Sequence, residues 1–197
     1  MPNGERVADA FLKDGVIYVV SFKQDTKTRE YTVVIYKSTT GKTGSFTQVA
    51  DFTYSTAPIS FDTDGNHFYV GRSARTNEEG IRQFIAILEK HGLSGSEVTL
   101  EEVLHLKTGV NYLENNNMLV SGEFVTKPEF ATYNRVEIPE EEAYAANCIW
   151  VNGTVIVPMG FPAVEKAVRD LGYPVILVDT SEYRKLDGGL SCLSLRF

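Results

Sequence analysis

The sequence contains few of the residues that build disulfide frameworks and metal centres. Its 197 residues include two cysteines, Cys148 and Cys192, and three histidines, His67, His91 and His105. Two cysteines do not make a disulfide framework, and these five residues do not show the spacing of zinc ligands. We therefore expect no structural disulfide and no metal site, and no cofactor is indicated.

Long apolar runs and an excess of basic residues are also lacking. No run approaches the roughly 18 apolar residues of a membrane span, and the polar residues 1–5 do not resemble a signal peptide. We therefore expect reduced cysteines and a cytoplasmic protein. Lys and Arg number 19 against 26 Asp and Glu, a formal net charge of -7. This balance argues against nucleic acid or an anionic membrane as a partner.

The first 62 residues are rich in strand-forming side chains. Runs of β-branched and aromatic residues at 16–20, 31–36 and 46–54 predict strands. A further strand is expected from Ile59, followed by a turn and a strand at 67–70. Together these segments predict an antiparallel meander.

One motif in this part suggests nucleotide binding but fails on inspection. Gly41-Lys42-Thr43 resembles the end of a phosphate-binding loop, yet Tyr36 stands where that loop requires a glycine. Without that glycine the backbone cradle for phosphate is missing. We therefore do not expect nucleotide binding.

From residue 67 onward, strands alternate with helices. Thr76 or Asn77 is a suitable cap for a helix over 78–91, and Pro162 opens a second helix within 161–171. Short strands are predicted at 98–106, 109–113, 118–121, 136–138, 148–151, 154–157 and 175–178. The repeated order of two strands, a helix and a strand indicates a modular α/β architecture.

The chemistry-bearing stretch is 187–197, where the pair Gly188-Gly189 precedes Cys192. Adjacent glycines suit a tight turn with close backbone approach, so this turn could present a nucleophilic thiol. The alternative is a buried edge strand in which Cys192 is only a small hydrophobic residue. Cys148 is expected to pack in the core, and the carboxylates of 140–142 to form a solvated loop.

Six stretches carry a family resemblance. They are residues 69–77, 104–107, 145–149, 157–162, 171–173 and 187–192. In this order they resemble the dimethylarginine dimethylaminohydrolases, members of the guanidine-modifying superfamily that includes arginine deiminases and amidinotransferases. The resemblance covers about residues 65–197.

The resemblance implies an α+β fold, a pseudo-fivefold α/β propeller built of ββαβ units. About 130 matched residues suffice for about three such units. The expected organisation is a β-rich segment of unknown role at 1–62, followed by a partial propeller at 63–197. Open sheet edges in a partial propeller would favour association, so another copy of the chain is a possible partner, in a homo-oligomer.

The resemblance also implies hydrolysis of N-methylated arginine, a small-molecule substrate, to citrulline and a methylamine. The family's nucleophile maps onto Cys192, its general acid/base onto His105, and the arginine that grips the substrate α-carboxylate onto Arg75. A guanidinium carbon needs a strong nucleophile such as thiolate, and histidine can protonate the departing amine. The implied intermediate is a covalent thiouronium on Cys192.

The acidic motifs with which the family binds the guanidinium nitrogens are not found in this sequence. Asp62, Asp64 or a second subunit are the candidates to replace them, because a buried guanidinium requires carboxylate partners. Two alternatives stay open at this point. One is a catalytically inactive module kept for binding or assembly, and the other is arginine deimination or amidino transfer on the same scaffold.

Overall fold

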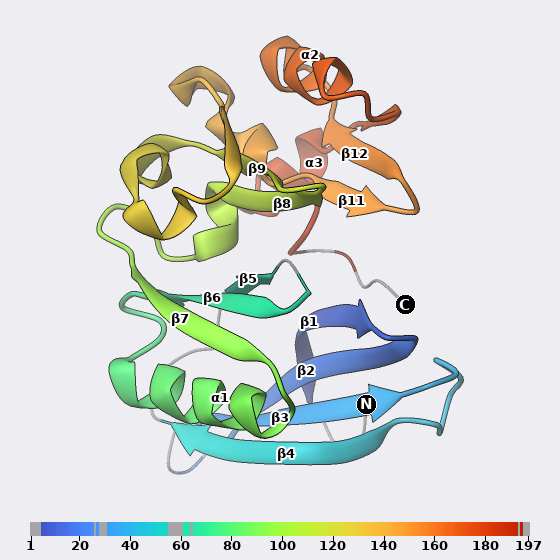
Figure 1. Cartoon of the computed structure of the whole chain (residues 1–197), viewed down its shortest axis with the longest axis vertical. Coiled ribbons are helices and arrows are strands. Elements are labelled where there is room, and N and C mark those ends of the chain that lie inside the picture. Colours follow the sequence, from blue (N-terminus) through green and yellow to red (C-terminus); the bar gives the residue numbers. More distant parts are fainter. Residues whose placement is uncertain are drawn as a thin grey trace. The chain divides into compact units, whose positions relative to one another are not determined.

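The computed structural model describes residues 5–25, 27, 31–54, 61–63, 65–192 and 194 (Figure 1). The chain divides into two compact units, the first extending to Thr99 and the second comprising Leu100–Ser194. The boundary predicted near residue 62 falls inside the first unit.

The first unit opens with a four-stranded antiparallel sheet in the order β1-β2-β3-β4. Its strands are β1 (Arg6–Lys13), β2 (Val16–Gln24), β3 (Tyr31–Ser38) and β4 (Thr47–Tyr54). Both faces of this sheet bury side chains: Val20, Val33 and Ile35 belong to one cluster, and Ala10, Ile17, Val19, Val34 and Tyr36 to another. The meander is confirmed for the strands predicted at 16–20, 31–36 and 46–54, and β1 is an additional strand that the sequence did not predict. The strand predicted at 67–70 belongs to a separate sheet.

A ββαβ motif completes the first unit. It consists of β5 (Phe61–Thr63), β6 (His67–Arg72), α1 (Glu78–Lys90) and β7 (Ser94–Thr99). Strand β6 pairs antiparallel with β5 and parallel with β7. The helix begins where predicted, because Asn77 Oδ1 accepts a 2.8 Å hydrogen bond from the backbone N–H of Gly80.

Helix α1 packs against both sheets of this unit, as Figure 1 shows beside β4 and β7. One core cluster therefore contains residues of the meander, of β6 and of the helix: Val20, Val33, Ile35, Phe68, Val70, Ile81, Phe84, Leu88 and Leu93. The meander and the first ββαβ motif thus share one hydrophobic core.

The second unit contains two more motifs of the same strand order. The first has β8 (Val110–Glu114), β9 (Asn117–Val120) and β10 (Asn134–Glu137), with the 3-10 helices η2 (Gly122–Thr126) and η3 (Pro128–Phe130) in place of an α-helix. The second has β11 (Ile149–Val151), β12 (Thr154–Pro158), α2 (Pro162–Asp170) and β13 (Val175–Val178). In both, the middle strand pairs antiparallel with the first and parallel with the last.

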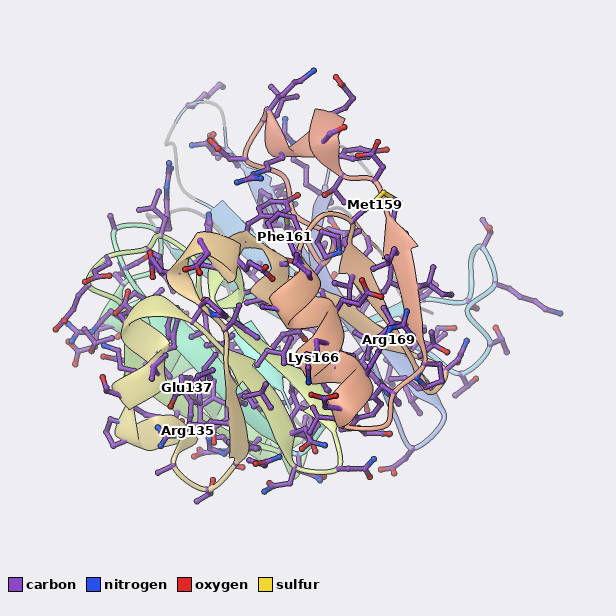
Figure 2. The ribbon with its side chains drawn as sticks, turned by 90° about the horizontal axis from the view of Figure 1, so that it is seen from above. Arg135, Glu137, Met159, Phe161, Lys166 and Arg169 are labelled. Atoms are coloured by element: carbon purple, nitrogen blue, oxygen red, sulfur yellow. The ribbon has the colours of Figure 1, made fainter. Side chains whose placement is uncertain are left out.

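Two short helices precede these motifs, η1 (Leu106–Thr108) before β8 and η4 (Glu140–Ala146) before β11, and α3 (Ser181–Arg184) follows β13. The core of this unit includes Cys148, which is 1% exposed. Lys166 and Arg169 lie along α2 (Figure 2) and pair with acidic residues one turn away, Asp170 and Glu165. These pairs are solvent-exposed, so they contribute little to stability.

In the acidic stretch at 140–142, Glu140 and Glu141 are exposed as expected, but the stretch opens the 3-10 helix η4 rather than forming a loop, and Glu142 has a structural role. The Glu142 carboxylate accepts hydrogen bonds of 3.1 and 2.9 Å from the backbone N–H groups of Ala163 and Val164. These are among the first N–H groups of α2, which have no partner within the helix. Glu142 therefore caps α2 from a distant segment.

The predicted fold class, α+β with ββαβ units preceded by an antiparallel meander, is confirmed. The described residues contain three ββαβ-type motifs, the number that the length of the matched segment implied. In the part of the chain that the structure describes, no helix has both the length and the apolar character needed to span a membrane.

Candidate active site

Cys192 lies exposed in a turn at the end of the second unit. Its Sγ accepts a 3.0 Å hydrogen bond from the N–H of Gly189 and lies 3.2 Å from the Gly189 carbonyl oxygen, to which the thiol can donate. The Gly189 residue thus offers partners to both the protonated and the deprotonated sulfur. The thiol is presented on a turn, which agrees with the nucleophile interpretation rather than the buried-strand alternative.

Segment η4 anchors this turn at two points. The Tyr144 hydroxyl donates a 2.8 Å hydrogen bond to the carbonyl of Gly188, and Asn147 Oδ1 accepts one of 2.8 Å from the N–H of Ser191. A Cβ on residue 189 would lie 2.6 Å from the Asn147 side chain. Glycine is therefore required at 189 for close approach, whereas the positive φ of the turn, 56°, belongs to Asp187.

The ring of Tyr144 makes a cation–π contact with Arg184. The guanidinium carbon of Arg184 lies 4.9 Å from the centroid of the Tyr144 ring and 5.4 Å from that of Phe161. Such stacking contributes about 0.5–1 kcal/mol at exposed sites. Arg184 therefore fixes the ring whose hydroxyl holds the Cys192 turn.

An apolar cavity of about 220 Å³ opens beside the turn. Gly189 and Leu190 line it together with Ile149 and Val178. No acidic side chain is among its described lining residues. The described lining of this cavity therefore offers no carboxylate to a guanidinium.

His105 lies in the same unit, at the N-cap of η1, with an extended backbone. It is exposed, while the next residue, Leu106, is fully buried and fixes the start of η1. Segment η1 packs against η4, the segment that anchors the Cys192 turn. Segment η4 thus contacts both the short helix that follows His105 and the turn that contains Cys192.

The residues before His105 do not form the strand predicted over 98–106. Strand β7 ends at Thr99, because the next backbone N–H groups donate to the Glu123 carboxylate. Distances are 3.0 Å from Glu101 N to Oε2, and 2.9 and 3.2 Å from Glu102 N and Val103 N to Oε1. Backbone donors used in this way are not available to a sheet.

The charge of Glu123 is also compensated. Burial raises the pKa of this carboxyl, but the hydrogen bonds from Glu102 and Glu101, the Lys127 ammonium 3.2 Å away and the Val103 N–H outweigh it and lower the pKa below its usual value. Glu123 is therefore held as a carboxylate beneath the segment that leads to His105.

The other predicted site residues belong to the first unit. Arg75 is exposed in the turn between β6 and α1, and its backbone N–H donates to Ser73 Oγ at 3.0 Å. Asp62 is in β5, where its backbone pairs with Tyr69, and its side chain lies outside the described residues, as does Asp64 entirely. Cys192 and His105 thus share one unit, and Arg75 is in the other.

Sequence reasoning missed the residues that hold the turn and the His105 segment. Tyr144 and Asn147 reach residues 44 positions further along the chain, and Glu123 reaches back by about 20. Such long-range contacts from polar residues have no local pattern. The stretch 145–149 did contain Asn147, but only as part of a resemblance.

The fold is that of a class of guanidine-modifying enzymes. SxtG, an amidinotransferase from Microseira wollei, matches 68% of this chain and 44% of its own, with a TM-score of 0.60 at 21% sequence identity. A likeness at this identity shows the fold alone. No family model matches the chain.

One curated relative and one solved structure are much more similar to this chain in sequence. N(G),N(G)-dimethylarginine dimethylaminohydrolase of Pseudomonas aeruginosa is 70% identical over 133 residues, which are 68% of this chain and 52% of that protein. A solved structure of the Pseudomonas enzyme, a cysteine-to-serine mutant complexed with citrulline, has a TM-score of 0.68 at 64% identity and covers 72% of this chain and 57% of that one.

The resemblance that the six stretches indicated is confirmed: about two thirds of this chain match dimethylarginine dimethylaminohydrolase at high sequence identity. The matched length equals that of the segment 65–197. The chain spans about half the length of the curated relatives it matches.

Proposed function

We propose that this protein hydrolyses N-methylated arginine to citrulline and a methylamine, with Cys192 as nucleophile and His105 as general acid/base. The observation that carries the proposal is the exposed Cys192 thiol on a turn anchored by η4, in a segment homologous to dimethylarginine dimethylaminohydrolase. The Pseudomonas structure with citrulline, in which serine replaces a cysteine, supports the same chemistry.

The proposed reaction has two steps. The Cys192 thiolate attacks the guanidinium carbon, the bond from that carbon to the methylated nitrogen breaks, and His105 donates the proton that the departing amine requires. Water then attacks the thiouronium carbon while His105 accepts its proton. The carbon–sulfur bond breaks, which releases citrulline and regenerates Cys192.

Substrate orientation requires charged partners at both ends of the arginine. Arg75 is proposed to bind the α-carboxylate, since a guanidinium pairs bidentately with a carboxylate. Asp62, Asp64 or a second subunit is proposed to bind the guanidinium, because the cavity beside the Cys192 turn offers no carboxylate among its described lining. Arg75→Ala is expected to raise KM more than it lowers kcat.

The decisive test compares citrulline release by the wild-type chain, Cys192→Ser and Cys148→Ser. Cys148 is a matched control, because it is the other free cysteine and is buried in the core. Intact mass after exposure to a chloro-amidine reports whether Cys192 is alkylated. We expect citrulline release and a single adduct, both lost in Cys192→Ser and retained in Cys148→Ser.

Other results select the alternatives. A wild-type chain with neither product nor adduct would contradict the proposal and leave a binding or assembly module. Activity on unmethylated arginine, or amidine transfer to an added amine, would indicate the related chemistries.

We also propose a cytoplasmic location, because Cys192 must stay reduced. We propose in addition that the chain self-associates, which light scattering can measure.

A further inference from the structure

The 3-10 helix η2 holds the His105 segment on both sides. On the N-terminal side, its residue Glu123 accepts the backbone N–H groups of residues 101–103. On the C-terminal side, a Cβ on Gly109 would lie 2.7 Å from the Phe124 ring, so Gly109 packs directly on η2. His105 is therefore bracketed by contacts to one short element.

The contact from Glu123 is buried and multiply satisfied. Its side chain is 6% exposed and that of its partner Lys127 is 16% exposed. Hydrogen bonds to a charged group are stronger than those between neutral groups. Loss of the carboxylate would leave three backbone donors and a lysine without this acceptor, so the segment before His105 would relax.

Segment η2 is itself fixed by hydrogen bonds and by burial. The Arg135 guanidinium, on β10 (Figure 2), donates a 2.7 Å hydrogen bond to the carbonyl of Val125 in η2. The N–H of Ser121, directly before η2, donates to the carbonyl of Gly109 at 2.9 Å. Phe124 is buried as well, so η2 can act as a fixed support.

We propose that Glu123 is a positioning residue for the reaction, which sets the place of the His105 imidazole by fixing residues 101–103. This inference rests on the proposed function, in which His105 transfers the protons. A side chain placed on a relaxed segment would transfer protons less efficiently, because a displacement of about 1 Å can cost up to a hundredfold in rate.

The test uses the full chain with Glu123→Gln, which keeps the size of the side chain and removes its charge. Glu142→Gln is the matched control, because Glu142 also binds backbone N–H groups with its carboxylate but supports α2 instead. We expect Glu123→Gln to lower kcat about 10- to 100-fold with little change in KM. The pH profile of kcat should shift, and alkylation of Cys192 by a chloro-amidine should persist.

Two further measurements separate positioning from general destabilisation. In the ¹H–¹⁵N spectrum of the imidazoles, the His105 signals should move in Glu123→Gln but not in Glu142→Gln, with His91 as internal reference. In a His105→Ala background, Glu123→Gln should cause no further loss of kcat. Glu123→Asp, which keeps the charge, should restore part of the activity.

The inference is overturned if Glu123→Gln leaves the His105 signals unmoved, or if its effect on kcat is the same with and without His105. A wild-type chain that releases no citrulline would refute the proposed function instead. The imidazole spectra would then still decide whether Glu123 fixes His105.

Discussion

The side-chain oxygen of Asn147 accepts a 2.8 Å hydrogen bond from the backbone N–H of Ser191, the residue before Cys192. Asn147 is the C-cap of η4, and its amide also lies against Gly189. One side chain thus fixes the turn on both sides of its tip. The exposed thiol of Cys192 is therefore held by neighbours that are half-buried or buried.

Removal of this contact should loosen the turn. We expect Asn147→Ala to slow alkylation of Cys192 about tenfold, since a lost hydrogen bond to a partly buried donor costs about 1–3 kcal/mol. Intact-mass kinetics with a chloro-amidine provide the measurement. Asn147→Asp keeps an acceptor oxygen and should behave more like the wild type; an equal defect in both variants would contradict the role given to this oxygen.

Overcrowding of the same contact should have a related effect. Gly189→Ala would place Cβ 2.6 Å from the Asn147 amide, so we expect a destabilised turn and slower alkylation of Cys192. In a Gly189→Ala/Asn147→Ala double variant the clash is relieved, so the two effects should be less than additive. Strict additivity would show that the two residues do not contact one another.

The N-terminus of α1 offers a test in the first unit. Asn77→Ala removes the side-chain acceptor for the N–H of Gly80 and should lower the free energy of unfolding by about 1 kcal/mol. Asn77→Ser retains a capping oxygen and should lose much less. Urea unfolding followed by circular dichroism measures both, and equal losses would exclude a capping role.

Stability at alkaline pH should depend on Tyr36. Burial, then a hydrogen bond from its hydroxyl to Glu5 and the charge of Glu5, raise the pKa of Tyr36 from 10.0 to about 12. The folded state therefore holds this proton more tightly than the unfolded state. The resulting stabilisation is complete below pH 10 and is lost as the pH rises from 10 to about 12.

Tyr36→Phe isolates this contribution, because the other tyrosines titrate in both proteins. The difference in free energy of unfolding between the wild type and Tyr36→Phe should be constant below pH 10 and shrink above it. Urea titrations at several pH values measure the difference. A difference that does not change with pH would contradict the raised pKa.

The sequence predicted those elements whose signals are local. Runs of β-branched residues located β2, β3 and β4, and Asn77 located the start of α1. Strand β1 was missed, because its residues, at 6–13, mix charged and apolar side chains without a clear run. The local sequence pattern also did not predict the second motif, in which the 3-10 helices η2 and η3 replace an α-helix.

The failures near the site have a common physical cause. The stretch 98–106, apolar residues interrupted by acidic ones, was predicted to be a strand, but Glu123 takes the backbone donors that the strand would need. The Cys192 turn was predicted from its glycines, whereas its anchors on η4 were not. Polar contacts between distant segments are determined by the tertiary fold, so a single sequence does not reveal them.

The shared core around α1 restricts how the protein can be dissected. Phe84, Ile87 and Leu88 line a cavity of about 20 Å³ together with residues of β2, β3 and β4. If the chain were shortened to begin at β5, these three side chains would face water and form an exposed apolar patch that favours aggregation. The hydrolase-like segment, although it is recognisable alone by homology, therefore depends on the sheet that precedes it to cover the apolar face of α1.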